Sequence, residues 1–385
     1  MLAIAYIGLK KKFDKFVDQY KHIPMEPLVP FLGQSLNYVF LEPSEVLRVG
    51  TEAVKNLGGT AVTFFGFNAR VYITDPKDVE VIATKRALQV KSDIYGLLSD
   101  WLGDGLILSH NEKWHKRRKI ISKSFHFKIL EEFVEVFDKN GRILVEQLMR
   151  NQNTTIDVFP KAAMCTLDVI CETSMGVSIN AQKNSESDYV QAVKKISEII
   201  ASRFVNPLKQ ASWIFRCTPS YFKQKQLIKV LHGMTDDVIA ARRREVSSQV
   251  IEKESISLEN DVGIRRKLAL LDVLLQSTID GKPLTNMEIR EEVDTFMFAG
   301  HDTTTSGISF CMYNLAKHPE VQQKAFEEIR NVIGDDVNKA VTQKDLNDLH
   351  YMELVIKESL RMFPSVPVFG REAQEDVEII SLKKL

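Results

Sequence analysis

The segment AGHDTTT, residues 299–305, places small, acidic and hydroxyl-bearing side chains inside an otherwise apolar stretch. Glycine lowers helix stability by about 1 kcal/mol relative to alanine, and threonine hydroxyls bond back to helix carbonyls and loosen the turn. This composition predicts a local opening where another group approaches the backbone; the alternative is a polar spot that faces a neighbour. A metal site at His301 and Asp302 is disfavoured, because adjacent helical side chains point about 100° apart and no further ligand has suitable spacing.

The segment lies in a helix predicted over residues 284–316. Thr285 and Glu288 have the spacing of a capping box, in which a hydroxyl and a carboxylate satisfy the free amides of the first turn. From Val293 onward the helix is apolar on nearly every side, which is typical of a helix inside a large domain.

A second group of chemically capable residues lies in NEKWHKRRK, residues 111–119. On a helix Trp114 and Arg118 share one face, and an indole N–H beside a guanidinium suits an anion such as a carboxylate. The other cations predict a basic exposed surface: Lys113, Lys116, Arg117 and Lys119. The simpler interpretation is a solvated charged helix anchored by one tryptophan.

Two further sites follow the long helix. Glu358 and Arg361 stand three residues apart in KESLRMFP, where they can form a local ion pair, and the apolar residues around them predict that the pair is at least partly buried. A surface pair is the alternative. Arg371 ends a short β-type run, PSVPVFGR, and is unremarkable in isolation.

Composition and periodicity predict a mainly α-helical protein. The 51 basic and 51 acidic residues give zero net charge, so nothing indicates a nucleic-acid partner. Four cysteines without zinc spacing indicate reduced thiols. Residues 249–262 predict an unstructured link. Helical period predicts helices at 43–57, 111–123, 129–150, 160–177, 187–205, 221–248, 266–278, 284–316, 319–332 and 350–362.

Short strands are predicted near both ends. AVTFFGF and ARVYITD, with Asn68 at the turn, indicate a hairpin, and PVFGR and DVEII indicate further strands of the same small sheet. Residues 1–23 indicate either the remainder of a membrane anchor or a short buried helix, since the apolar run is too short to span a bilayer. Residues 24–34 are Pro-rich and predict a hinge, and residues 35–385 a single domain.

Taken in order, these motifs resemble the cytochrome P-450 superfamily of haem-thiolate monooxygenases. The sequence is most similar to that of the fourth family, the microsomal fatty-acid hydroxylase branch. The similarity is carried by KSDIYGLLSDWLGDGLILS, KWHKRRK, SFHFKILEEF and FMFAGHDTTTSGISF. The resemblance covers residues 24–379. It implies the P-450 fold, a large helical domain with a small mixed β-sheet, incomplete at its C-terminal end.

The resemblance also implies roles for particular residues. Ala299, Gly300, Asp302 and Thr303 would line the groove over the distal face of haem b, where Thr303, backed by Asp302, would relay protons to bound oxygen. Trp114, Arg118 and Arg371 would bind the haem propionates. Glu358 and Arg361 would lock the framework behind the haem.

The implied activity is hydroxylation of a lipophilic substrate, such as a fatty acid or isoprenoid, with O2 and electrons from NADPH. The electrons would come through a flavin reductase, which the basic residues beside Trp114 would meet, with cytochrome b5 as a further partner. The implied location is the cytosolic face of the endoplasmic reticulum membrane.

Two departures from the family pattern change these expectations. Ala299 stands where many members of the fourth family have a glutamate that forms an ester with the haem. The sequence also has no loop of the FxxGxRxCxG type, because all four cysteines precede Glu358. The sequence as given is therefore expected to lack the axial ligand of the haem iron and to be inactive. The alternative is a non-catalytic, truncated helical protein that binds a lipid or a partner.

Overall fold

The computed structural model describes residues 2–125, 127–150, 154–183, 187–256 and 269–379. The chain forms two compact units. Unit 1 comprises Met1–Asp100, Lys194–Ile228 and Gly370–Leu385, and unit 2 comprises Trp101–Val193 and Lys229–Phe369. Helices α10 (Asp188–Val205) and α13 (Pro219–Ile256) contribute residues to both units.

Unit 1 is built around a β-hairpin. Strands β1 (Thr60–Phe65) and β2 (Asn68–Ile73) pair antiparallel, and β1 is buried along its whole length. Phe65 is the register partner of Asn68, so the turn consists of the two residues between them, and Gly66 there has a φ of 65°. The predicted hairpin is confirmed, but Asn68 begins the second strand and does not form the turn.

Helices and an N-terminal segment complete unit 1. Helix α1 (Leu2–Asp18) buries Phe13, whose ring packs edge-on against Phe67 at 5.4 Å. No helix among the described residues is long and apolar enough to cross a bilayer. The other helices of the unit are α2 (Leu36–Val39), α3 (Pro43–Asn56), α4 (Pro76–Thr84), α11 (Pro207–Gln210) and α12 (Ser212–Phe215), with short 3₁₀ turns at Arg86–Leu88 and Asp93–Leu98.

The predicted C-terminal strands are wrong over the described residues. The only strand-like pairing of PVFGR is an isolated bridge between Arg371 and Lys91, and the described part of DVEII forms no strand. Ile379 is buried there even so.

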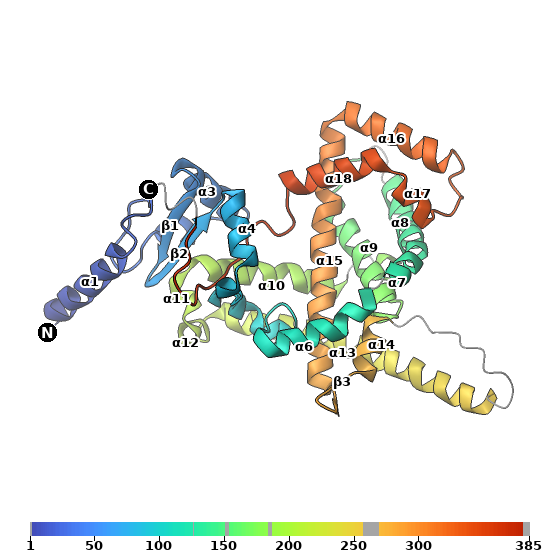
Figure 1. Ribbon diagram of the computed structural model, residues 1–385, viewed down its shortest axis with the longest axis horizontal. Helices are drawn as coiled ribbons and strands as arrows, with labels where there is room; N and C mark the ends of the chain where they lie inside the picture. The colour runs from blue at the N-terminus through green and yellow to red at the C-terminus, as the bar shows by residue number, and fades with distance from the viewer. Residues whose placement is uncertain (1, 126, 151–153, 184–186, 257–268, 380–385) are drawn as a thin grey trace. The chain divides into compact units, whose positions relative to one another are not determined.

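Unit 2 is a helical assembly around α15 (Asn286–Lys317), the long helix that is drawn upright in Figure 1. Helix α9 (Val158–Ile170) packs alongside it, and α18 (His350–Met362) packs against its C-terminal half. The other helices are α6 (Asn111–Ile121), α7 (Phe127–Glu132), α8 (Val134–Met149), α14 (Leu270–Gln276), α16 (Pro319–Ile333) and α17 (Gln343–Asn347), with short helix α5 (Ser99–Leu102) at the unit boundary. The mainly helical architecture predicted from periodicity is therefore confirmed.

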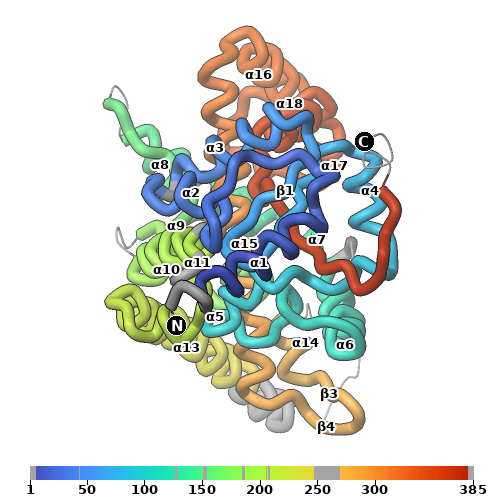
Figure 2. The backbone as a smooth tube through the Cα atoms, turned by 90° about the vertical axis from the view of Figure 1, so that its left-hand side faces the viewer, coloured from blue at the N-terminus to red at the C-terminus, as the bar shows by residue number. Residues whose placement is uncertain are grey.

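A second hairpin joins α14 to α15, as Figure 2 shows. Strands β3 (Thr278–Ile279) and β4 (Lys282–Pro283) pair antiparallel across Asp280 and Gly281, whose φ angles are 51° and 77°. Two positive φ angles are those of a type I′ turn, which favours Asp-Gly. The predicted unstructured link at 249–262 is wrong in its first part, because α13 continues to Ile256; the rest lies outside the described residues.

Candidate functional site

Helix α15 begins with the predicted capping box. The Glu288 amide donates to Thr285 Oγ1 at 3.2 Å, and the Thr285 amide donates to the Glu288 carboxylate at 2.8 Å. The helix then continues without interruption through residues 299–305. The Thr303 hydroxyl donates to the Ala299 carbonyl at 2.6 Å, so the expected back-bonding occurs but the helix itself does not open.

One side of the 299–305 segment is packed against α9. A Cβ added to Gly300 would lie 2.6 Å from Ile170 Cδ1, so the missing side chain allows the two helices to approach closely. Thr305 Oγ1 lies 2.7 Å from Thr166 Oγ1. At Gly300 and Thr305 the polar and small residues therefore serve helix packing, as in the alternative that the sequence left open.

The opposite side of the segment is only half-buried. It carries Ala299, Asp302 and Thr303. Burial raises the pKa of the Asp302 carboxyl group. Its side chain makes no hydrogen bond or ion pair to the residues that the structure describes, and Ser365 Oγ donates to the Thr303 carbonyl at 2.8 Å. This face can therefore present a proton-holding carboxyl and a hydroxyl to a bound group.

Buried His301 lies on the packed side of the segment, between Gly300 and Thr305 around the helix. Its side chain is 2% exposed, its ring packs edge-on to Tyr189 at 6.2 Å, and neither ring nitrogen has a hydrogen-bond partner within the described chain. Burial lowers its pKa to about 4, so the ring is neutral at physiological pH. The described residues contain no cluster of three metal-ligating side chains.

Helix α6 carries the predicted anion-binding pair. Trp114 is half-buried with its ring edge-on to His115 at 5.1 Å, and Arg118 is exposed on the same helical face. The Arg118 guanidinium has no carboxylate partner in the part of the chain that the structure describes. It is therefore available to an anionic ligand.

The prediction that all the other cations of α6 form an exposed basic surface is wrong for Arg117. It is 1% exposed, and its Nη2 lies 2.7 Å from Glu288 Oε1 on α15. Lys113 is 36% exposed but ion-paired, with Nζ 2.8 Å from Asp104 and 3.4 Å from Glu291. Spacing within α6 could not reveal the contacts with α15, because Glu288 lies 171 positions from Arg117 and Glu291 lies 178 positions from Lys113.

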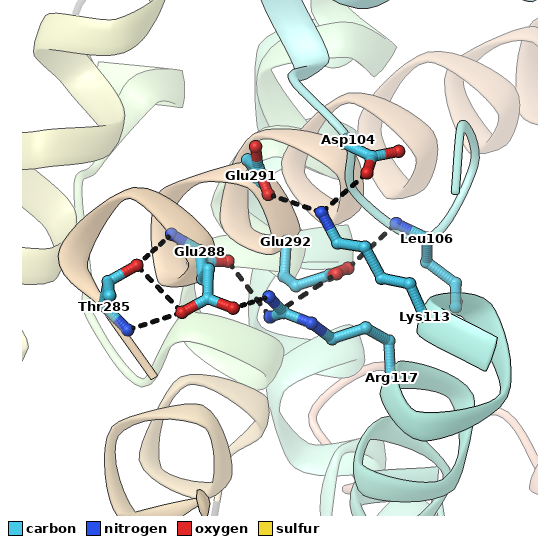
Figure 3. A network of polar contacts seen from close by, with 8 residues as sticks. All are labelled: Asp104, Leu106, Lys113, Arg117, Thr285, Glu288, Glu291 and Glu292. Atoms are coloured by element: carbon cyan, nitrogen blue, oxygen red, sulfur yellow. Dashed lines mark hydrogen bonds and ion pairs between the residues drawn. The ribbon is translucent and has the colours of Figure 1, made fainter. Parts of the chain in front are cut away.

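Glu292 completes this network, which Figure 3 shows. Its side chain is fully buried, and the Leu106 amide donates to its Oε2 at 3.1 Å. Arg117 Nη1 lies 3.8 Å from Glu292 Oε1, which is beyond hydrogen-bond distance. Burial raises the pKa of Glu292, whereas the Leu106 amide and Arg117 lower it. The effect of burial is the larger one, and the pKa rises to about 7.

The Glu358–Arg361 pair forms, but it is not buried as predicted. Arg361 Nε and Nη2 donate to the two Glu358 oxygens at 2.7 Å and 2.8 Å. The two side chains are 71% and 57% exposed. Of the apolar residues thought to cover the pair, Leu354, Ile356 and Leu360 are exposed, and only Val355 is buried.

Arg371 belongs to unit 1, whereas Trp114, Arg118 and the 299–303 face belong to unit 2. Within unit 1, Arg371 Nη1 donates to the Gly370 carbonyl at 2.9 Å. Its place in a propionate site remains a prediction.

The residues of unit 2 fit one part of a haem site. An unpaired arginine beside a tryptophan suits the two carboxylates of a porphyrin, and the half-buried α15 face offers small and hydroxyl side chains. Cys165, Cys171 and Cys311 are buried, and burial raises the pKa of Cys165 to about 11 and that of Cys171 further.

Comparison with known proteins identifies the family of this chain. Residues 23–382 match the family model of cytochrome P450. The chain is 47% identical over 355 residues to cytochrome P450 4d2 of Drosophila melanogaster, a match that covers 91% of this chain and 71% of the relative. It is 44% identical over 374 residues to cytochrome P450 4d1 of the same species, covering 96% and 73%.

A further relative belongs to a neighbouring subfamily. Cytochrome P450 4c3 of Drosophila melanogaster is 38% identical over 390 residues, covering 98% of this chain and 72% of the relative. All three relatives carry the designation of the fourth family. The chain belongs to the cytochrome P450 family of monooxygenases and is most similar to its fourth family.

Proposed function

We propose that unit 2 holds haem b between α6 and α15 and that the protein serves hydroxylation of a lipophilic substrate, such as a fatty acid or isoprenoid. One observation carries the proposal: unit 2 contains both the half-buried face of α15 and, on α6, an Arg118 beside Trp114 that has no carboxylate partner among the described residues. When bound, haem supplies the iron centre at which O2 is activated. Electrons would come from NADPH through a flavin reductase, with cytochrome b5 as a second donor.

Trp114 and Arg118 would bind the propionates. Both lie on one face of α6, and the guanidinium can form a two-pronged contact with a carboxylate while the indole donates one hydrogen bond. Arg371 would add a second cation, as the family resemblance implies. Ala299 would leave room beside the porphyrin, whereas Gly300 would let α15 pack closely on α9 behind that face. Glu358 with Arg361 would brace the framework behind the haem.

Asp302 and Thr303 would move protons to the reacting oxygen. The pKa of Asp302 is raised by burial, which brings its proton affinity closer to that needed for exchange near neutral pH. Thr303 Oγ1 now donates to Ala299, and a hydroxyl can turn to donate to a ligand while it accepts from another donor. The pair therefore supports a carboxyl-to-hydroxyl proton path.

The membrane and reductase surfaces follow from exposed side chains. In unit 1, α1 exposes Tyr6, Ile7 and Leu9 next to Lys10–Lys12, a combination suited to the cytosolic surface of the endoplasmic reticulum. In unit 2, Lys116 and Lys119 remain the cations of α6 that can face an acidic reductase. Such an encounter would weaken as salt rises.

The second candidate is a non-catalytic helical protein that binds a lipid or a partner. The deep burial of Cys165 and Cys171, which raises the pKa of both thiols, supports it, because neither lies on the half-buried face of α15. The absence of the family's glutamate at Ala299 also excludes a covalent link to haem through this position. On this view the helices would be retained for binding alone.

Titration with haemin and a fluorescent fatty acid separates these two functions. The proposal predicts that haemin saturates the full chain in a one-to-one complex with a new Soret band, and that the fatty acid shifts this band. Fatty-acid binding of equal strength with and without haemin, together with no saturable Soret change, would favour the non-catalytic protein. A Soret position characteristic of thiolate in the reduced carbon monoxide complex would overturn the expected inactivity.

A further inference from the structure

We propose that Arg117 and Glu292 are positioning residues that fix the orientation of α6, and with it the face that carries Trp114 and Arg118, relative to the 299–303 face of α15. They act together with Lys113, Glu288 and Glu291, and we call these five residues the clamp. This inference rests on the proposed binding of haem propionates by Trp114 and Arg118.

The clamp uses the face of α6 next to the anion-binding face. Lys113 and Arg117 are four residues apart, as are Trp114 and Arg118, so each pair forms one stripe of the helix. The stripes are offset by one residue, or about 100°. Because both belong to one helix, ion pairs on the first stripe also fix the direction of the second.

On α15 the clamp lies on the same stripe as the proposed haem-facing residues. Glu288, Glu292, Ala299 and Thr303 follow one another at intervals of four, seven and four residues, which keeps them on one side of the helix. At about 1.5 Å per residue, Glu292 lies roughly 10 Å along the axis from Ala299. The clamp therefore holds α6 on the correct side of α15, two turns before the small residues.

A loop adds a third point of attachment. Residues 103–106 (GDGL) run against α15, where a Cβ at Gly105 would come within 2.6 Å of the Glu291 carbonyl and a Cβ at Gly103 within 2.6 Å of Glu291 Cγ. This close approach brings the Leu106 amide to Glu292 Oε2. Asp104, in the same loop, holds Lys113 at 2.8 Å. Loop, α6 and α15 are thus joined at one buried centre (Figure 3).

The two central residues of the clamp, Arg117 and Glu292, are almost completely buried, which indicates a structural role for them. Glu292 is fully buried and Arg117 is 1% exposed, although taking charged groups out of water is costly. Buried ion pairs add little net stability compared with apolar packing, but they fix geometry. Lys116, by contrast, pairs with exposed Asp280 and Glu112 at the protein surface.

The test is the haemin dissociation constant of the purified full chain and its variants. Arg117→Met and Glu292→Leu are expected to weaken haemin binding about tenfold, the size typical of lost support behind a direct ligand. Glu292→Gln should bind haemin as the wild type does, because its amide oxygen can still accept from Leu106. Lys123→Met, which removes an exposed cation two residues beyond α6, is the matched control and should bind normally.

Arg118→Leu, measured in parallel, distinguishes the positioning role of Arg117 and Glu292 from the proposed propionate site. Weaker binding in Arg118→Leu with wild-type affinity in Arg117→Met and Glu292→Leu would overturn the positioning role and leave the proposed function standing. Wild-type affinity in Arg118→Leu would overturn the proposed propionate site itself. Should circular dichroism show that Arg117→Met is unfolded, Arg117→Lys takes its place: it keeps the charge but loses the two-pronged reach, and normal binding would contradict the proposal.

Discussion

Arg117 Nη2 lies 2.7 Å from Glu288 Oε1, so a single carboxylate both neutralises a buried guanidinium and closes the capping box of α15. The Thr285 amide and hydroxyl hold the pKa of Glu288 below its usual range, so its carboxylate stays charged opposite Arg117. The start of the central helix and the attachment of α6 therefore depend on the same residue.

Loss of this ion pair should destabilise the fold strongly. Arg117→Met leaves the buried Glu292 and the partly exposed Glu288 without their cation, and breaking one partner of a buried pair costs about 3–5 kcal/mol. The free energy of unfolding from urea titration gives the value. Lys116→Met is the control, because its partners are exposed; an equal, small loss in both variants would contradict the buried role of Arg117.

Stability should depend on pH through Glu292. In the folded protein its pKa is raised from 4.5 to about 7, so between these values the folded state binds a proton that the unfolded chain has released. This contribution is complete below pH 4.5 and is lost as the pH rises through 7, about 3 kcal/mol in total. Urea titrations should show wild type losing stability relative to Glu292→Gln over this window. Parallel pH profiles would contradict the assignment.

The titration of His301 should change the stability of the fold with pH in the opposite direction. Its pKa is lowered from 6.5 to about 4, so the unfolded chain binds the extra proton and stability falls as the pH drops through this range. His301→Phe keeps an aromatic ring beside Tyr189 and removes the unpartnered nitrogens. It should be less sensitive to acid than the wild type in thermal melts, and an unchanged acid sensitivity would exclude His301 as the cause.

Gly300→Ala should destabilise the packing of α15 on α9. The added Cβ would lie 2.6 Å from Ile170 Cδ1, and overpacking of this kind costs about 1–3 kcal/mol. Ile170→Val should restore part of the loss. In Gly141→Ala on α8, where the added Cβ meets open space, helix propensity alone should instead raise stability by up to about 1 kcal/mol. Equal effects at the two glycines would contradict the packing role of Gly300.

The helices could be predicted because each has a long apolar period and its own end signals. Thr285 and Glu288 marked the start of α15 correctly, and the mainly helical fold followed. The weak strands could not be predicted from β-type runs alone: Arg371 makes a single bridge, whereas the Asp280–Gly281 turn signalled a hairpin that was overlooked.

The site could be predicted only in part. Trp114 and Arg118 share a face because of local helical spacing, which a sequence displays directly. Arg117 looked like its exposed neighbours, and nothing local reveals that Glu288 lies opposite it, 171 positions away. Glu292 stands beside Glu291 in the charged segment EIREEVD, just before the apolar stretch begins at Val293, so its burial had no local signal either. Glu358 and Arg361 looked buried because their neighbours are apolar, yet most of those neighbours are exposed too.

The proposed haem site depends on Arg118 and Trp114, which would bind the porphyrin carboxylates against α15. The haemin dissociation constant of Arg118→Leu, set against that of Lys123→Met, is the decisive measurement. We expect at least about tenfold weaker binding in Arg118→Leu, since a charge-assisted hydrogen bond contributes about 1.5–3 kcal/mol, and no change in the control. Equal affinity in wild type, Arg118→Leu and Lys123→Met would contradict it.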